Sequence, residues 1–295
     1  MSATGTVVAR RPLARLRRRA RPAREFDRPR FLVVITLLFY VLLFAPIVVV
    51  ALFSFNTTKS LQVFQGFSLR WYREFFGDSS LVSSLEASLE ISAVTMVAAT
   101  ALGTSLAFGL VRSRTRWSPA ANILMLVPLV TPEIVAGVGA LLLFTQLNVH
   151  LSLLTVMIAQ TTFSISYVTV VVRARLAALG TEQEYAAMDL GATRIGALRL
   201  VTLPALWPAI LSSGLLVFAL TFDDFVLSFF TSGVSPQPLP VRIYSAIRFG
   251  IRPTINAVGT FMLVISLAVI ALAVLLPRWL GSRETGFDVL TGSEG

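Results

Sequence analysis

The chain has 295 residues, of which 55% are hydrophobic and only 14% are charged, and its mean hydropathy is +0.78. A soluble domain carries about a quarter charged residues, so this composition excludes a soluble fold and predicts that lipid is the solvent. The absence of cysteine excludes disulfides, thiolate metal sites and cysteine nucleophiles, and His150 is the single histidine. We therefore expect no catalytic residue, metal or cofactor in this chain.

The net charge of +10 is concentrated at the start of the chain, because ten of the 25 basic residues lie within positions 1–30. Such a run is also typical of a transit peptide or of an arm that binds nucleic acid. We favour a disordered cytoplasmic tail that fixes the topology of the first membrane span, with no nucleic acid as partner. No small-x-small cleavage site follows the first apolar run, so we expect that run to be retained.

Six segments are long and apolar enough to cross a membrane as helices, which takes about 20 residues. They are Phe31–Phe53, Ile91–Leu110, Ser118–Val149, Leu151–Val172, Trp207 to about Phe230, and Pro253–Pro277. The sequence thus predicts an all-α, polytopic membrane protein with a six-span domain over residues 31–280 and a cytoplasmic tail over 281–295. Close helix packing is expected at four glycines in these spans, Gly103, Gly109, Gly137 and Gly139.

The orientation of the spans follows from the distribution of arginine and lysine. If the N-terminus is inside, the inner segments 1–30, 111–117, 173–206 and 278–295 hold nineteen basic residues and the outer segments hold six. This asymmetry predicts that both termini are cytoplasmic.

The first sizeable outer loop, residues 54–85, is rich in aromatic residues. Its aromatic residues include Phe67, Trp71, Tyr72, Phe75 and Phe76. This pattern is typical of an amphipathic segment at the membrane interface and equally of a surface that docks a partner. The sequence leaves both interpretations open.

The third span contains one acidic residue, Glu133, which follows Pro128 and Pro132. Prolines kink or end helices, so we expect a break where the carboxylate lies. A broken helix at membrane depth is tolerated only against protein or a water-filled cavity. Glu133 is therefore a candidate for the substrate pathway.

The longest inner loop, residues 173–206, is predicted to form two short helices joined at Gly191. The first runs from Glu182 to Asp189, and an amphipathic turn follows through Ile195, Leu198 and Val201. The apolar residues of such a projecting loop need a protein to cover them. The alternative is a loop that merely folds against the inner face of the membrane.

The fifth span carries two adjacent acidic residues, Asp223 and Asp224, within its apolar run. An ionisable group at mid-membrane costs about 2.5–3.5 kcal/mol on insertion scales, so each carboxylate calls for a partner or a water path. Successive helical residues point about 100° apart, so both cannot face one narrow path. We expect one to line the pathway and the other to bond to a neighbouring helix, the alternative being that Glu133, Asp223 and Asp224 are all structural polar contacts.

The inner loop resembles the EAA loop of permease subunits of bacterial ABC importers. The resemblance is carried by Ala186, Ala187, Asp189, Leu190, Gly191 and Ala192, followed by Leu203 and Pro204. In that family the loop forms a coupling helix seated in a groove of the cytoplasmic ATPase. The family's glutamate usually stands directly before the two alanines, where this chain has Tyr185, and Glu184 stands one place earlier as the candidate substitute.

The resemblance extends over nearly all of the chain after the tail. Segments 66–76, 128–144, 166–177, 222–233 and 239–260 are similar to the PotC-type spermidine/putrescine permeases. This similarity implies the type I ABC importer permease fold and half of a polyamine pathway that works by alternating access. It also implies an ATPase dimer, a second homologous permease, an extracytoplasmic substrate-binding protein and the lipid of a bacterial inner membrane as partners. Permeases for opines, phosphonates and thiamine are nearby relatives.

No ATP site is expected in this chain, since the single lysine, Lys59, lies outside and lacks the Gly-rich turn of a Walker A loop. ATP and magnesium would be bound by the partner ATPase. Two other hypotheses are a stand-alone secondary transporter or channel, which would not explain the exposed loop, and a membrane-embedded enzyme, for which the chain lacks clustered catalytic residues.

Overall fold

The computed structural model describes residues 30–60, 63–112, 118–234, 236–249 and 252–281. Nearly all of the two predicted tails lies outside these ranges. Within them the chain is helical, apart from turns and one isolated β-bridge between Asn56 and Phe67. The all-α prediction is therefore confirmed for the described residues.

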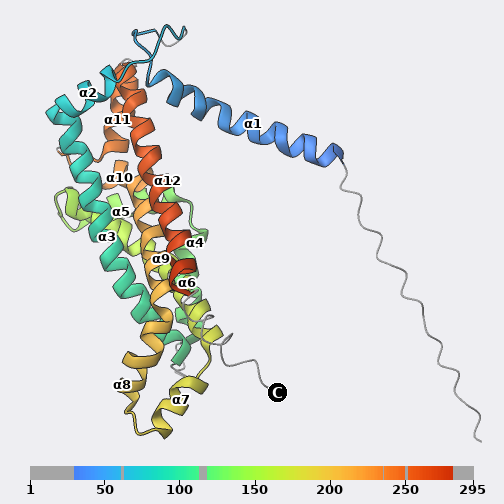
Figure 1. The fold of residues 1–295 in the computed structure, drawn as a ribbon. Helices are drawn as coiled ribbons and strands as arrows, with labels where there is room; N and C mark the ends of the chain where they lie inside the picture. Colours follow the sequence, from blue (N-terminus) through green and yellow to red (C-terminus); the bar gives the residue numbers. More distant parts are fainter. Residues whose placement is uncertain (1–29, 61–62, 113–117, 235, 250–251, 282–295) are drawn as a thin grey trace, which may run out of the picture. The chain divides into compact units, whose positions relative to one another are not determined.

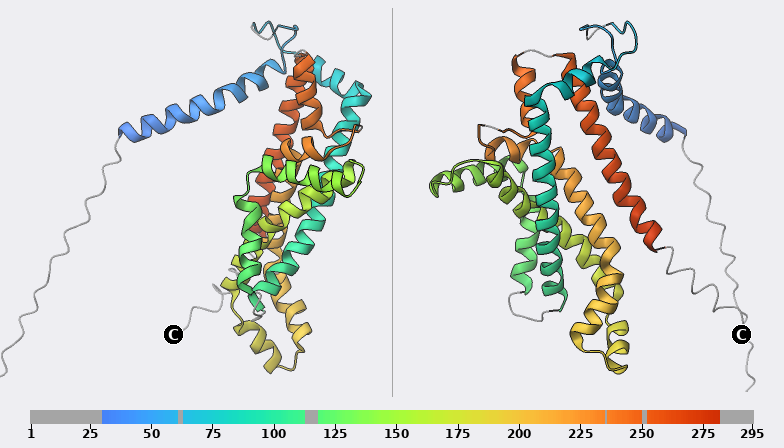
Figure 2. Two further views of the ribbon diagram at one scale, coloured as in Figure 1. Left: turned by 180° about the vertical axis from the view of Figure 1, so that it is seen from behind. Right: turned by 60° about the vertical axis from the view of Figure 1, so that its left-hand side comes forward.

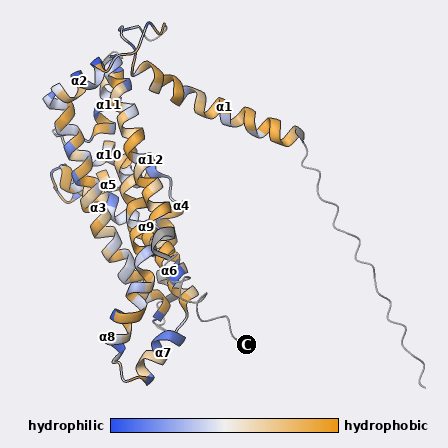
Figure 3. Ribbon diagram, in the orientation of Figure 1, coloured by the Kyte–Doolittle hydropathy of each residue, from blue (hydrophilic) through white to orange (hydrophobic). Residues whose placement is uncertain are grey.

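The long helices coincide with the predicted spans, with ends shifted by up to twelve residues. The helices are α1 (Arg30–Phe53), α2 (Arg70–Gly77), α3 (Ser79–Arg112), α4 (Ser118–Val130), α5 (Glu133–Gln146), α6 (Leu153–Leu179), α7 (Glu182–Asp189), α8 (Arg194–Ala197), α9 (Leu203–Phe222), α10 (Val226–Thr231), α11 (Leu239–Phe249) and α12 (Pro253–Gly281). In the described part of the chain, five helical segments are apolar and long enough to cross a membrane, and α4 with α5 makes a sixth if the pair counts as one span. Figure 3 shows the hydrophobic character of the long helices and the hydrophilic character of α7.

The chain divides into two compact units, residues 1–48 and 49–295. In the first, α1 carries no charge from Phe31 onward, and its large apolar side chains are exposed almost without exception. A helix with this surface is suited to being surrounded by lipid.

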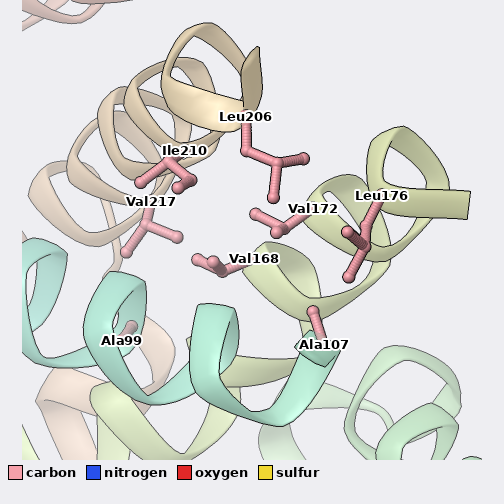
Figure 4. Close-up of a cluster of buried hydrophobic side chains, with 8 residues drawn as sticks. All are labelled: Ala99, Ala107, Val168, Val172, Leu176, Leu206, Ile210 and Val217. Carbon is pink, nitrogen blue, oxygen red and sulfur yellow. The ribbon is translucent and has the colours of Figure 1, made fainter. Parts of the chain in front are cut away.

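The core of the second unit lies where α3, α6 and α9 pack together (Figure 4). Its buried side chains are Ala99, Ala107, Val168, Val172, Leu176, Leu206, Ile210 and Val217. A Cβ at Gly103 would lie 2.7 Å from the Val168 Cβ and 2.9 Å from the Ile165 carbonyl oxygen. Only glycine permits this approach of α3 to α6, which confirms close packing at Gly103.

The helices α2 and α11 lie at one end of this unit, and α7 and α8 lie at the other (Figures 1 and 2). At the first end, Phe75 of α2 packs on Phe261 of α12 at 5.6 Å between ring centroids, and the backbone N–H of Leu239 donates to Ser88 Oγ at 2.8 Å. At the opposite end, Glu184 of α7 pairs with Arg112, the last residue of α3. Helices of the two longer predicted outer segments, 54–85 and 231–252, thus lie at the end opposite the predicted inner loop 173–206.

Two aromatic residues of the 54–85 segment belong to the protein core. Trp71 and Phe75 are fully buried, and Trp71 Nε1 donates to the Asn56 carbonyl oxygen at 2.7 Å. Neither is free to anchor at a membrane interface or to dock a partner, whereas Phe67 and Phe76 are exposed.

The third span is broken just before Glu133, as the prolines predicted. The axes of α4 and α5 differ by 107° across Thr131 and Pro132, and Pro128 remains inside α4. A Cβ at Gly137 of α5 would lie 2.7 Å from Phe230 of α10, so close packing is confirmed there, whereas Gly109 and Gly139 have open space beside them.

The fifth span does not continue as a helix to Phe230. A continuous helical segment runs from α8 through a π-helical turn, Leu198–Thr202, into α9 and ends at Phe222. Asp223 and Asp224 form the break before the short helix α10. The prediction of one helix through both aspartates was wrong, because the Asp224 carboxylate accepts from the Ser228 N–H at 3.0 Å and so competes with a helical backbone bond.

Candidate functional site

The predicted coupling loop forms two short helices, α7 and α8, joined at Gly191. Gly191 has a φ of +95°, and its N–H donates to the Met188 carbonyl oxygen at 2.9 Å. This is the left-handed turn with which glycine commonly ends a helix. Thr193 then caps α8 by accepting from the Gly196 N–H at 3.0 Å, so the predicted helix–glycine–helix arrangement is confirmed.

Apolar side chains are exposed along this loop. Leu190 is 91% exposed and Leu200 is 77% exposed. Among the other loop residues that the family pattern singles out, two are half-buried, Ala187 and Ala192, and the rest are exposed, namely Tyr185, Ala186, Asp189, Gly191 and Pro204. The loop therefore presents an apolar surface that a protein partner would cover.

Glu184 does not belong to that exposed surface. Its carboxylate pairs with the Arg112 guanidinium at the end of α3 and accepts from the Thr202 hydroxyl at 2.5 Å. The candidate substitute for the family's glutamate is thus engaged inside the chain rather than projecting toward a partner.

A second candidate site lies where the broken segments meet. Glu133 at the start of α5 and Asp224 after α9 line one cavity of about 50 Å³. The two carboxylates are close enough to repel each other electrostatically. The cavity is lined by Glu133, Gln160, Phe163, Ser164, Tyr167, Leu220, Thr221, Asp224 and Leu227.

Asp224 is held in place by hydrogen bonds from two elements. Gln160 Nε2 of α6 donates to Asp224 Oδ2 at 2.8 Å and to Ser228 Oγ at 3.0 Å. The Ser228 N–H of α10 donates to the same carboxylate oxygen at 3.0 Å. These bonds fix the orientation of the carboxylate in the cavity.

The cavity presents hydrogen-bond acceptors and negative charge. Gln160 is 2% exposed, and its Oε1 is buried without a hydrogen-bond partner among the described residues. A buried acceptor of this kind costs about 1–3 kcal/mol unless a donor reaches it. The rings of Phe163 and Tyr167, 5.8 Å apart, add faces that attract cations. This arrangement suits a group that brings positive charge and several N–H donors.

Asp223 lies apart from the cavity. Asp223 is exposed and is absent from the cavity lining. The structure therefore brings together two of the three predicted pathway carboxylates, Glu133 and Asp224, and leaves Asp223 outside the cavity.

Sequence reasoning missed four residues of these two sites: Gln160, Ser228, Arg112 and Thr202. For Gln160 a signal existed, because a lone amide in an otherwise apolar span calls for a hydrogen-bond partner. Arg112 was counted only as a marker of topology, and its pairing with a residue 72 positions away left no local pattern.

Residues 99–285 match the family described as binding-protein-dependent transport system inner membrane component. The putrescine transport system permease protein PotI of Escherichia coli K12 is 40% identical over 238 residues, which cover 78% of this chain and 85% of that protein. The spermidine/putrescine transport system permease protein PotC of Haemophilus influenzae is 35% identical over 256 residues, or 87% of this chain and 98% of the relative.

Among solved structures, a bacterial ABC transporter involved in the import of the acidic polysaccharide alginate has a similar fold. One of its chains superimposes with a TM-score of 0.66 at 12% identity, covering 84% of this chain and 94% of that one. This likeness confirms the predicted fold of ABC importer permeases. The match to the family and to its permeases also excludes the enzyme and secondary-transporter hypotheses. The chain belongs to the inner membrane components of binding-protein-dependent transport systems, the permease subunits of ABC importers.

Proposed function

We propose that this chain forms half of the translocation pathway of an ATP-driven importer of polyamines such as putrescine and spermidine. The observation that carries the proposal is the cavity that Glu133, Asp224 and Gln160 line together. Relatives named for putrescine and for spermidine/putrescine transport support the same substrate class.

Polyamines are flexible chains with a primary ammonium group at each end. An ammonium group carries three N–H donors and one positive charge, which complement the two carboxylates that line the cavity. One water molecule needs about 10–15 Å³ of cavity volume, so a cavity of about 50 Å³ has room for a few waters or for an ammonium head group. We infer that the cavity holds one end of the substrate at a time.

The exposed apolar surface of α7 and α8 supports docking of a cytoplasmic ATPase dimer, which would bind ATP and magnesium. The excess of arginine on the same side as this loop supports cytoplasmic N- and C-termini. A second homologous permease would complete the pathway, and an extracytoplasmic binding protein would deliver the substrate at the opposite end. Transport would proceed by rigid-body alternation between inward and outward states.

An acidic cavity disfavours anionic substrates such as phosphonates, because like charges repel strongly where water is scarce.

Opines and thiamine are tested as competitors of the polyamines. Reconstitution of the chain with its ATPase, partner permease and binding protein measures both uptake and ATP hydrolysis.

The decisive variants are Asp224→Asn and its matched neighbour Asp223→Asn. A hydrogen bond to a charged group contributes about 1.5–3 kcal/mol, so Asp224→Asn is expected to lower putrescine or spermidine uptake about 10- to 100-fold. Asp223→Asn also removes one carboxylate charge, but this charge lies outside the cavity, so uptake is expected to change less than about threefold.

Both variants should assemble, which co-purification of the ATPase verifies. Normal polyamine uptake by Asp224→Asn would overturn the pathway role of the cavity. ATP hydrolysis that ignores every polyamine-loaded binding protein, but responds to an opine or thiamine, would overturn the substrate class.

A further inference from the structure

Three segments that are distant in sequence converge on the carboxylate of Glu184. Arg112 ends α3, Glu184 lies in α7, and Thr202 lies in the π-helical turn that precedes α9. Glu184 Oε1 pairs with the Arg112 guanidinium and accepts from Thr202 Oγ1 at 2.5 Å. We name these three residues the Glu184 junction.

The Glu184 junction connects α7 to the tightly packed core. Ala107 of α3 and Leu206 of α9, each close in sequence to a junction residue, are fully buried in the cluster that α3, α6 and α9 share. Packed interiors resist compression and move as units. The side chain of Glu184 therefore links α7 both to α3 and to the turn that leads into α9.

The junction also has a direct structural connection to the acidic cavity. The helical segment that contains Thr202 continues through the 20 residues of α9, a length of about 30 Å at 1.5 Å per residue. It ends at Phe222, two residues before Asp224. The π-helical turn itself, Leu198–Thr202, is a wide and rare form that frequently marks functional positions in helices.

Stability alone does not account for the junction. The side chains of Arg112 and Glu184 are 30% and 18% exposed, and partly exposed ion pairs contribute little to folding. The pair is better suited to fixing the position of α7 relative to α3 than to holding the protein together.

We propose that Glu184 is a positioning residue that passes movement of the ATPase-facing helix α7 to α3 and α9, and so to the cavity at Asp224. This role rests on the proposed function, because it assigns an ATPase to the surface of α7 and α8. It differs from a direct ionic contact between Glu184 and the ATPase.

The test uses the complete complex with an introduced thiol. The sequence contains no cysteine, so Leu220→Cys at the edge of the cavity is a unique reporter in this subunit. ATP and magnesium are expected to change its rate of reaction with a thiol reagent severalfold in the otherwise unaltered chain. This readout requires no transported substrate.

Glu184→Gln and Arg112→Gln are expected to abolish that ATP-driven change while the ATPase still co-purifies. The matched control is Glu182→Gln, which removes an exposed carboxylate from the same helix and should retain the change. The charge swap Arg112→Glu with Glu184→Arg should restore the ATP-driven change at least in part. The swap also keeps the test possible if one of the single variants fails to assemble.

An ATP-driven change that persists in Glu184→Gln overturns the inference, and so does a reporter that ignores ATP in the unaltered chain. The thiol reporter could respond to ATP although no polyamine-loaded binding protein stimulates ATP hydrolysis by the complex. That result overturns the polyamine assignment and leaves the Glu184 junction supported.

Discussion

The helices α3, α6 and α9 and the broken segments around the cavity use polar residues in opposite ways. Within the three helices, several buried hydroxyl groups bond to a carbonyl oxygen about one turn earlier in their own helix, as Ser92 does to Ser88 at 2.7 Å and Ser213 to Ile210 at 2.9 Å. Around the cavity, polar side chains join different elements, as Gln160 joins Asp224 and Thr155 joins the Thr231 carbonyl oxygen at 2.7 Å.

The difference reflects where the backbone is continuous. A continuous helix satisfies its own backbone groups, so its neighbours need only fit its shape. Breaks at Thr131–Pro132 and Asp223–Asp224 free backbone and side-chain groups, and these must be satisfied by partners from other elements. The first region thus gives the chain a rigid body, and the second gives it a place where a charged group can be bound.

The largest effect is expected from crowding the rigid core. In Gly103→Leu the first added carbon alone would lie 2.7 Å from the Val168 Cβ and 2.9 Å from a backbone oxygen. Inserting extra methylenes into a packed core typically costs about 1–3 kcal/mol, and we expect a leucine that meets both a side chain and backbone to cost more, against a whole stability of about 5–15 kcal/mol for a domain. We expect no monodisperse protein by size-exclusion chromatography in detergent.

Gly109→Leu is the matched control in the same helix, because open space lies beside Gly109. It should purify like the unaltered chain. Equal behaviour of the two variants would show that α3 and α6 do not pack as closely as described.

A smaller effect, confined to transport, is expected at the cavity. Gln160→Leu removes the donor that orients Asp224 and the free acceptor beside it, while it keeps the size and apolar contacts of the side chain. Polyamine uptake should fall about tenfold, the equivalent of one hydrogen bond to a charged group, and the yield of folded complex should change little.

The control is Thr162→Val, which removes only a bond from Thr162 to its own helix, to the Ile158 carbonyl oxygen at 2.8 Å. An equal loss of uptake in both variants would mean that α6 does not tolerate the loss of any polar side chain and that Gln160 has no special role.

The sequence predicted the long helices of the core better than the cavity, for a physical reason. Uninterrupted apolar runs can cross a membrane only as helices, so five spans and their order follow from hydropathy, and Pro132 predicts the break in the sixth. The end of α9 at Phe222 has no proline or glycine to mark it. The partners of Asp224 and Glu184 come from elements 64 and 72 residues away, and such pairs depend on tertiary packing.

The smallest effect is expected from Tyr185→Glu, which restores the glutamate that the family usually has before the two alanines. Tyr185 is 59% exposed, and its neighbour Glu184 already holds Arg112 and Thr202. A new carboxylate would point about 100° away from Glu184 on the helix, so substrate-stimulated ATP hydrolysis should change less than about twofold.

The informative measurement is the same Tyr185→Glu substitution in the Glu184→Gln background. If Glu184 acts through the junction, the introduced carboxylate cannot reach Arg112 and hydrolysis stays uncoupled from uptake. If the loop needs only one carboxylate to contact the ATPase, the introduced group supplies it and coupling returns. Rescue would therefore mean that Glu184 acts by contacting the ATPase, whereas failure to rescue means that it acts through its contacts with Arg112 and Thr202 in this chain.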